Sequence, residues 1–365
     1  MLTCSFMGLG LIGGSIARAI REYLPDTKIK VYDSDISSLA LALKEGIATS
    51  IYTEITEDLC HADYIFLCAP VSVNEQIVRS IKPFLQSHTM LSDVGSVKTG
   101  IHKVIESLDL EGQFIGGHPM AGSERFGFAN SKSSLLENAY YIITPTAKVS
   151  EKNVSEFTSI VTSLKALPLV MEYENHDYVT AAISHLPHII ASSLVNLVKD
   201  SDSEDGYMKT VAAGGFKDIT RIASSNAVMW EQICMTNSNN IKKLLSDYIH
   251  SLEEIKEQLD ARDSCAIYDL FSESRIYRDS FSSTGAGPIK PSFTITVEIA
   301  DRTGSLAEIT VLMASESLNI KNLNIVHNRE AEFGALSVEF YKESDMLKAI
   351  ELLQKADFMT HLRKL

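Results

Sequence analysis

Short apolar runs alternate with helical periods of apolar residues along the first 170 or so residues of the chain. The strand-like runs cover residues 2–7, 28–32, 64–67, 90–93, 114–117 and 140–144. Helical periods cover residues 13–24, 36–45 and 73–81, and Pro25 and Gly46 mark the ends of the first two. Strands that alternate with helices predict a mostly parallel, doubly wound sheet in an α/β domain over residues 1–168.

The pattern changes after a last strand-like run at residues 169–172. Helical periods dominate residues 169–281, and one long period runs from residue 230 to 260. Its apolar stripe includes Ile241, Tyr248 and Leu252, which suits a helical bundle or a subunit interface, with ordinary core packing as the alternative for any one position. We therefore expect an all-helical second domain that takes part in dimerisation.

A Ser-, Gly- and Pro-rich stretch follows at residues 282–292 and is typical of a linker. Beyond it, strand-like runs at residues 293–299, 322–327 and 334–340 are combined with helical periods at residues 305–317 and 345–356. This βαββα order predicts a small α+β domain with an antiparallel sheet over residues 293–365.

The charge and cysteine content narrow the functional classes. The formal net charge is -14 in 365 residues, which disfavours a nucleic-acid partner because phosphate binding needs a basic surface. The five cysteines are scattered without a CxxC pair, so we expect a reducing compartment and no metal site. No apolar run reaches the roughly twenty residues of a membrane span, so we expect a soluble cytoplasmic protein.

A glycine-rich turn directly follows the first predicted strand. Gly8, Gly10 and Gly13 form a GxGxxG pattern at the start of a helix. The first glycine allows the tight turn, the second lets a pyrophosphate approach the backbone, and the third lets helix and strand pack closely. Asp33 ends the second strand, where a carboxylate binds ribose hydroxyls and repels a 2′-phosphate. The pattern predicts a Rossmann-like domain that binds NAD. The residues expected at the cofactor are Gly8, Gly10, Leu11, Ile12, Gly13, Asp33 and Ser96.

Five segments together resemble the prephenate dehydrogenase family. They are GLGLIGGS at residues 8–15, DVGSVK at 93–98, GGHPMAGSE at 116–124, SHLPH at 184–188 and GGFKDITRIASSNAVMW at 214–230. The resemblance covers nearly all of residues 1–280. It implies NAD-dependent oxidative decarboxylation of prephenate to 4-hydroxyphenylpyruvate, a step in the synthesis of L-tyrosine.

That reaction needs a base near the ring alcohol and cationic groups for two carboxylates. The resemblance implies that His118 deprotonates the alcohol, and imidazole suits this because its ordinary pKa lies near neutral pH. It also implies that Ser96 contacts the nicotinamide, the substrate hydroxyl or His118, although Ser96 could instead cap the helix that follows it.

The substrate carboxylates call for a guanidinium, and Arg221 is the candidate. It could equally pair with Asp218, which would hold it in position. His188 is expected nearer the substrate than His185, and Glu124 either gates the pocket or pairs with a basic residue. Trp230 is expected to reach the site from a neighbouring subunit, with ordinary packing as its alternative. The residues expected around the substrate are Arg221, His188, His185, Glu124, Gly214, Asp218 and Trp230.

The segment ADRTGSL at residues 300–306 resembles the turn that precedes the first helix of ACT domains, which have a ferredoxin-like fold. Such domains commonly pair across subunits and bind amino acids. The resemblance implies that L-tyrosine binds near Asp301, Gly304 and Leu306 of a homodimer as a feedback inhibitor. A dimerisation module without a ligand is the alternative.

Three other functions remain open on the sequence. Arogenate, which has an amine where prephenate has a ketone, could be the substrate. A dehydrogenase of β-hydroxyacids would share the first domain but use a catalytic lysine of its second domain, and the SHLPH and TRIA segments speak against it. An inactive amino-acid sensor would need none of His118, Ser96 and Arg221, yet all three are present.

Overall fold

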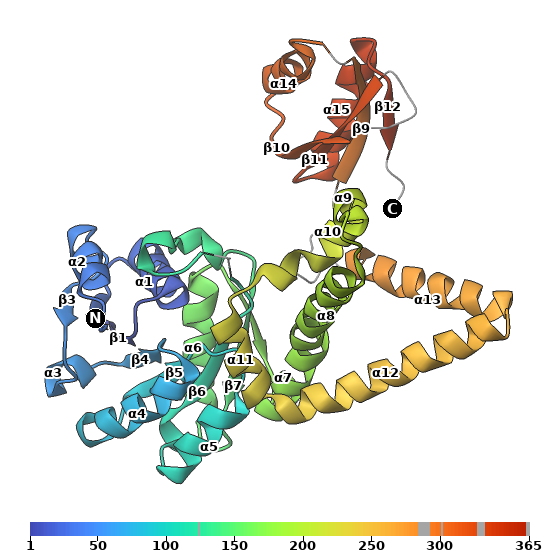
Figure 1. Ribbon diagram of the computed structural model, residues 1–365. Helices are drawn as coiled ribbons and strands as arrows, with labels where there is room; N and C mark the ends of the chain where they lie inside the picture. The colour runs from blue at the N-terminus through green and yellow to red at the C-terminus, as the bar shows by residue number, and fades with distance from the viewer. Residues whose placement is uncertain (123–124, 284–292, 301, 327–332, 363–365) are drawn as a thin grey trace. The chain divides into compact units, whose positions relative to one another are not determined.

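A parallel sheet of five strands forms the first part of the chain, in the order β3-β2-β1-β4-β5 (Figure 1). The computed structural model describes residues 1–122, 125–283, 293–300, 302–326 and 333–362. The strands are β1 (Thr3–Met7), β2 (Lys28–Tyr32), β3 (Ser50–Tyr52), β4 (Tyr64–Leu67) and β5 (Met90–Asp93). The strand order runs outward from β1 in both directions, and sheets of this kind bind ligands beyond the carboxyl ends of the strands where the order reverses, here those of β1 and β4.

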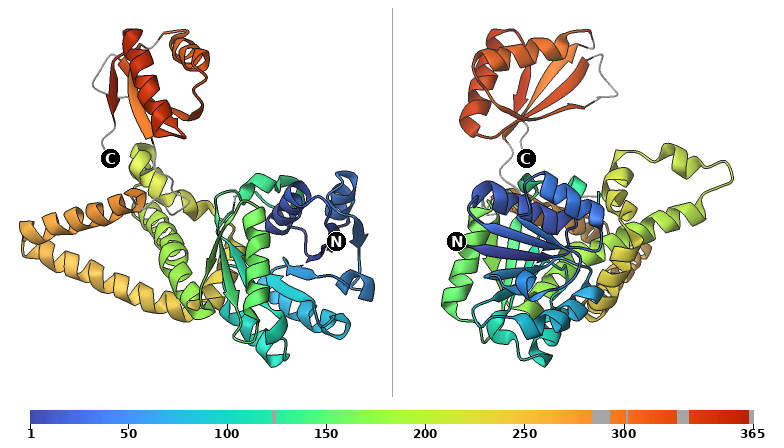
Figure 2. Two further views of the ribbon diagram at one scale, coloured as in Figure 1. Left: turned by 180° about the vertical axis from the view of Figure 1, so that it is seen from behind. Right: turned by 90° about the vertical axis from the view of Figure 1, so that its left-hand side faces the viewer.

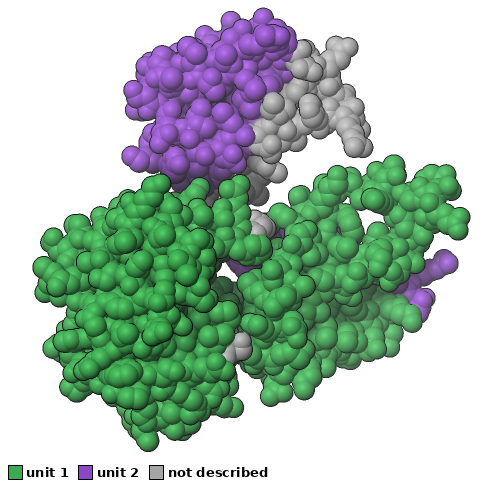
Figure 3. Space-filling model, turned by 60° about the vertical axis from the view of Figure 1, so that its left-hand side comes forward, with its two compact units in different colours: residues 1–257 green, residues 258–365 purple. Residues whose placement is uncertain are grey.

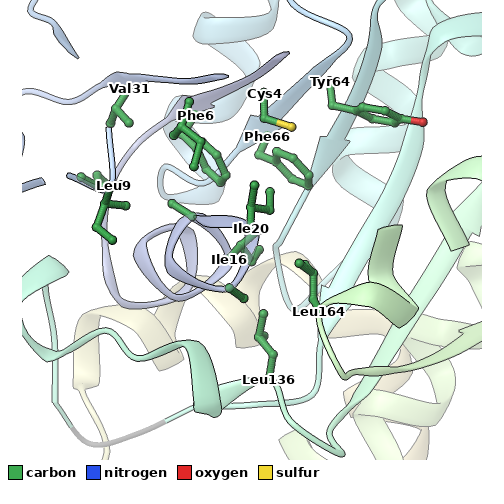
Figure 4. Packing of buried hydrophobic residues seen from close by; sticks show 14 of the residues in the cluster. Cys4, Phe6, Leu9, Ile16, Ile20, Val31, Tyr64, Phe66, Leu136 and Leu164 are labelled. Atoms are coloured by element: carbon green, nitrogen blue, oxygen red, sulfur yellow. The ribbon is translucent and has the colours of Figure 1, made fainter. Parts of the chain in front are cut away.

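Helices cover both faces of this sheet, because alternate strand residues supply two separate apolar cores. Cys4, Phe6 and Phe66 face one core, in which the rings of Phe6 and Phe66 stack with centroids 5.0 Å apart (Figure 4). Met7 and Ile65 face the other. The predicted doubly wound α/β domain is thereby confirmed. Its helices are α1 (Leu11–Tyr23), α2 (Ile36–Lys44), α3 (Glu57–Cys60), α4 (Val71–Ile81), α5 (Thr99–Ser107) and α6 (Glu151–Ser163).

The three later strands form a separate mixed sheet and do not extend the first one regularly. β6 (Ile115–Pro119) pairs antiparallel with β7 (Tyr140–Pro145), which pairs parallel with β8 (Leu167–Val170). One parallel bridge between Leu91 and Phe114 joins the start of this sheet to β5. The arrangement brings β6 to the carboxyl end of β5.

A helical segment follows, as predicted. It comprises α7 (Tyr173–Thr180), a π-helical turn (Ala181–His185), α8 (Leu186–Ser201), α9 (Tyr207–Val211), α10 (Gly214–Thr220), α11 (Ala227–Thr236) and α12 (Ser238–Asp260). The prediction of one helix over residues 230–260 is wrong, because the backbone leaves helical geometry at Asn237, between α11 and α12. The side chain of Asn237 is buried and holds other polar groups, as described below.

One helical stretch among the described residues, 173–201, is long and apolar enough to cross a membrane by length and composition alone. A single stretch of this kind is weak evidence, since core helices of soluble proteins meet the same criterion.

The chain divides into two compact units, Met1–Glu257 and Gln258–Leu365 (Figure 3). In the second unit, α13 (Ser264–Ser283) takes in the first two residues of the predicted linker, and residues 284–292 lie outside the described part of the chain.

The end of the chain folds as a βαββαβ unit, the ferredoxin-like order (Figure 2). Its antiparallel sheet has the order β10-β11-β9-β12, and α14 and α15 share one apolar core with it. The short strand β12 was not predicted, since three residues give no recognisable period. The elements are β9 (Phe293–Ala300), α14 (Ser305–Ser315), β10 (Ile320–Val326), β11 (Phe333–Phe340), α15 (Glu343–Lys355) and β12 (Thr360–Leu362).

Candidate functional site

The glycine turn after β1 has the backbone that each of its three glycines was expected to supply. Gly8 has a φ of +102°, and a Cβ there would lie 2.8 Å from the backbone nitrogen of Ala69. A Cβ on Gly13 would lie 2.8 Å from the Gly8 carbonyl oxygen. A Cβ on Gly10 would meet no described atom within 4 Å. Two glycines therefore serve close packing, and the third leaves an open approach to the backbone.

The start of α1 is suited to an anion. Its N-cap is Gly10, no described side chain caps it, and its first turn carries no acidic residue. The first N–H groups of the helix, those of Leu11, Ile12 and Gly13, have no carbonyl one turn earlier in the helix to bond. A dinucleotide pyrophosphate fits such a cradle.

Asp33 lies directly after β2 and faces this turn. Its carboxylate accepts hydrogen bonds from the backbone N–H groups of Leu9 (2.5 Å) and Asp35 (2.7 Å), one on each oxygen. Each oxygen keeps a further lone pair, so the carboxylate can still accept a hydrogen bond from a ribose hydroxyl. The residues of the cradle thus fit NAD.

A buried ion pair lies where β5 ends. The ammonium group of Lys98 contacts the Asp93 carboxylate and donates to the carbonyl oxygen of Gly117 (2.6 Å). The Lys98 side chain is 0% exposed, and burial lowers its pKa, although Asp93 opposes that shift. Asp93 also accepts from the N–H groups of Gly95 (2.9 Å) and Gly117 (3.3 Å). These contacts fix the loop 94–97 and β6 against each other.

Ser96 lies half-buried on that loop. The alternative that it caps α5 is wrong, because the N-cap position of α5 is Lys98. The N–H groups of Lys98 and Thr99 donate instead to the carboxylate of Asp177, at 2.7 and 2.8 Å. The side chain of Ser96 is therefore not needed for the helix, and its expected contact with nicotinamide or substrate stays a prediction.

His118, on β6, belongs to a chain of three hydrogen-bonded side chains. Its Nδ1 lies 2.8 Å from Nε2 of His176, and Nδ1 of His176 lies 2.8 Å from Oδ1 of Asp177. His176 and Asp177 stand on α7 and are 0% and 1% exposed. This arrangement engages Nδ1 of His118, and no hydrogen bond to its Nε2 is found among the described residues.

The surroundings of His118 favour the neutral imidazole. Burial lowers its pKa well below the ordinary value, and the nearby His176, Lys98 and His185 lower it further. A neutral imidazole at working pH can accept a proton, as a general base must.

His185 is held from its far side by Asn237. The Asn237 amide nitrogen donates to the Asp177 carbonyl oxygen (2.7 Å) and lies 3.2 Å from Nδ1 of His185. Because that nitrogen is a donor, Nδ1 of His185 accepts and Nε2 carries the proton. Burial is the main cause that lowers the pKa of His185, to about 4. His185 is thus a neutral donor, and Asn237 supports both it and the backbone of α7.

His188 lies half-buried on α8, one turn beyond the π-helical turn. Its Nδ1 donates to the Ser184 carbonyl oxygen (2.9 Å), and its ring stacks on the indole of Trp230 with centroids 3.6 Å apart. Burial lowers the pKa of His188, the bond to Ser184 opposes this, and Arg221 lowers it further. The guanidinium of Arg221 is therefore close enough to lower the pKa of His188. Arg221 is exposed and is the first residue of the helical turn after α10.

The remaining expected residues are less closely tied to this group. Gly214 and Asp218 are exposed on α10. Trp230 packs on His188 and His185 of its own chain, as its packing alternative has it, and an approach from a second subunit stays a prediction. Glu124 and Asp301 lie outside the described residues.

In the ferredoxin-like unit, Gly304 is the N-cap of α14 with a φ of +96°. Such a backbone favours glycine, and a Cβ there would meet no atom of the described residues within 4 Å. Leu306, in the first turn of α14, is 41% exposed.

Sequence reasoning missed His176, Asp177, Asn237 and the role of Lys98. The usable signal was an adjacent His-Asp pair on the polar start of an otherwise apolar helix, at residues 176–177. No group of three His, Cys, Asp or Glu suited to a metal ion is found among the described residues.

Comparisons with known proteins agree with this geometry. Residues 16–169 match the family model for the nucleotide-binding domain of prephenate dehydrogenase, and residues 172–273 match that for its dimerization domain. A prephenate dehydrogenase of Bacillus subtilis is 34% identical over 98% of this chain and 97% of its own, and one of Lactococcus lactis is 32% identical over 97% and 98%. The crystal structure of an Aquifex aeolicus prephenate dehydrogenase with hydroxyphenyl propionate and NAD+ is 31% identical, with a TM-score of 0.73 over 77% of this chain and 99% of its own. A Synechocystis arogenate dehydrogenase is 26% identical, with a TM-score of 0.70 over 77% and 100%.

Proposed function

The chain belongs to the prephenate dehydrogenase family, and we propose that it oxidises prephenate with NAD+ to 4-hydroxyphenylpyruvate, CO2 and NADH. The observation that carries the proposal is the position of His118, whose Nδ1 lies 2.8 Å from Nε2 of His176 and whose Nε2 has no hydrogen-bond partner among the described residues. The anion cradle of α1 supports NAD as the cofactor.

Bound NAD+ supplies the acceptor for the hydride on the alcohol carbon of prephenate. His118 takes the alcohol proton at Nε2 as the carbon–oxygen double bond forms. The bond to the ring carboxylate then breaks, its electron pair enters the ring, and CO2 leaves. His118 returns the proton to the same oxygen, which becomes the phenol, so no net proton is released.

The cationic part of the site is assigned to Arg221. A guanidinium offers two parallel N–H donors to a carboxylate, and Arg221 already influences His188. We assign His188, His185 and Ser96 to the polar wall around the ring, and Glu124, Gly214, Asp218 and Trp230 to its margin. This wall binds and orients the substrate and limits water.

A steady-state assay of NADH formation tests the proposal. Purified protein is given prephenate or arogenate, each with NAD+ or NADP+, and kcat/KM is compared among the four pairs. The proposal requires the highest value for prephenate with NAD+. A higher value for arogenate would make the chain an arogenate dehydrogenase, and turnover of neither compound, together with tight tyrosine binding, would support the inactive sensor.

We further propose a homodimer, formed through the helical domain. Residues on α10, α11 and α12 leave large apolar side chains exposed, such as Ile219 (60%), Met235 (68%) and Leu259 (59%). Exposed apolar side chains on successive helices suit a subunit interface. Trp230 would then approach the site of the second copy. Light scattering coupled to size-exclusion chromatography tests the dimer, and a monomeric mass at micromolar concentration would contradict it.

We also propose the domain boundaries, the cellular location and the regulation of this protein. We assign residues 1–168 to NAD binding, 169–281 to the substrate and the dimer, 282–292 to a linker and 293–365 to regulation, in a cytoplasmic enzyme. A Cβ on Gly304 would meet no described atom within 4 Å, and no described side chain caps α14, which supports binding of L-tyrosine beside Leu306 and Asp301. Calorimetric titration with L-tyrosine tests this. Inhibition that persists without residues 284–365 would place the effect elsewhere.

A further inference from the structure

We infer that His176 and Asp177 are positioning residues for the proposed reaction: they hold His118 in the tautomer whose Nε2 accepts the substrate proton and stabilise the imidazolium that results. The inference rests on the proposed function of His118. It concerns a buried chain of contacts from α7 to β6, and the two residues of this chain on α7 lie outside the sequence motifs.

The starting point is Asp177, which can only accept hydrogen bonds while it is ionised. Its two oxygens accept from the N–H groups of Lys98 and Thr99, from Oγ1 of Thr99 and from Nδ1 of His176. Burial alone would raise the pKa of Asp177, but these hydrogen bonds lower it. Asp177 is therefore a carboxylate at neutral pH, and Nδ1 of His176 carries a proton.

The contact with His176 determines the tautomer of His118. With Nδ1 as the donor to Asp177, His176 can accept a hydrogen bond at Nε2. Nδ1 of His118 lies 2.8 Å from Nε2 of His176 and donates to it. The proton of neutral His118 is thus on Nδ1, and the lone pair of the reactive imidazole is on Nε2. Without His176, both tautomers of His118 would be populated, and only one of them is a base toward the substrate.

The position of the His176 ring between the carboxylate and the base has a consequence of its own. A carboxylate in direct contact would raise the pKa of His118 and protonate it before the substrate binds. In this protein His176 lies between them, and burial lowers the pKa of His118 well below its ordinary value. When His118 takes the alcohol proton, its Nδ1–H bond to His176 becomes charge-assisted, and Asp177 stabilises the two rings together.

The experiment compares three variants of the full chain. His176→Ala removes the acceptor of His118 Nδ1, whereas His176→Gln replaces it with an amide oxygen of similar reach. Thr99→Val is the matched control, since it removes one donor to the same carboxylate and leaves the chain of histidines intact. Each variant is measured for kcat and KM with prephenate, for the pH profile of kcat/KM, for NADH binding and for thermal unfolding.

We expect kcat to fall about a hundredfold in His176→Ala and about tenfold in His176→Gln, while KM changes less than about threefold. The acidic limb of the pH profile should move in His176→Ala, since the hydrogen-bond partner of His118 Nδ1 is gone. Thr99→Val should keep kcat within about twofold. Wild-type kcat and an unshifted profile in both His176 variants would overturn the inference. Equal losses in Thr99→Val would reduce His176 and Asp177 to structural support.

A measurement without turnover separates this inference from the proposed function. The 15N chemical shifts of histidine-labelled wild-type protein report the tautomer of each imidazole, and His118→Asn identifies the signals of His118. Protonated Nδ1 and unprotonated Nε2 are expected at pH 7. The opposite tautomer would overturn the inference even if prephenate is oxidised, and the expected tautomer would support it even if prephenate is not the substrate.

Discussion

Replacement of Lys98 by methionine tests whether the loop beside the site is held by a desolvated ion pair. Methionine keeps most of the apolar stem and removes the ammonium group. Asp93 would then be a buried carboxylate that keeps two backbone donors, Gly95 and Gly117. The Gly117 carbonyl would lose its lysine donor.

The magnitude follows from burial. Removing one partner of a buried ion pair costs about 3–5 kcal/mol, because the other charge is left uncompensated. Lys98 is 0% and Asp93 3% exposed, so solvent cannot replace the lost partner. The two remaining N–H donors to Asp93 put the expected loss near the lower end, at about 3 kcal/mol. Adding Asp93→Asn should restore about 1–2 kcal/mol, since no buried charge is then left unpaired.

The assay is urea unfolding followed by the fluorescence of Trp230, the single tryptophan, which lies in the same compact unit. A second readout is the pH profile of kcat/KM. The charge of Lys98 is one cause that lowers the pKa of His118, so the acidic limb of the pH profile should move to higher pH in Lys98→Met. A loss below about 1 kcal/mol with no gain from Asp93→Asn would refute the reasoning, because the pair would then behave as a solvated one.

Four further outcomes are expected. Gly10→Ala should keep the wild-type melting temperature but weaken NAD binding about tenfold or more. Gly13→Ala should lower the melting temperature, because its added methyl group would collide with the Gly8 carbonyl oxygen. Equal melting temperatures of the two variants would contradict the assigned packing. His118→Asn should retain NADH binding and lose about a hundredfold or more in kcat, and wild-type turnover would remove it from the mechanism. Arg221→Ala should mainly raise KM for prephenate, and an unchanged KM would reassign that residue. Burial is the main cause that lowers the pKa of His102 from 6.5 to about 4. Between these pH values the unfolded chain binds a proton at His102 and the folded chain does not, so the folded state loses stability as the pH falls. Acidification should therefore lower the urea midpoint, and it should do so less in His102→Phe.

The sequence predicted the helices and strands that are long enough to show a regular pattern of apolar residues. Both strands and helices of the first 93 residues were found where the apolar pattern was strong, and β2 was placed to the residue. It failed at short elements such as β3, α3 and β12, which are too brief to show a period. It also merged α11 and α12 into one helix, because Asn237 between them is an unremarkable polar residue in a helical pattern. The break has its physical reason in the Asp177 carbonyl and His185, which are sixty and fifty-two residues away.

What the sequence determined by itself was therefore the chemistry that stands in contiguous segments. The glycine turn, Asp33 and the histidine of the HPMAG segment are local patterns, and each constrains a backbone or a side chain within a few residues of itself. Only the tertiary structure decided which groups support that chemistry. His176 and Asp177 contact His118 and the start of α5 from α7, and Asn237, at the end of α11, donates to the Asp177 carbonyl oxygen. Such contacts depend on how α7 packs against the sheet, and no spacing along the chain encodes them. A buried polar group needs a hydrogen-bond partner that is near in space, and the partners of His118 stand on α7, well beyond it in the sequence.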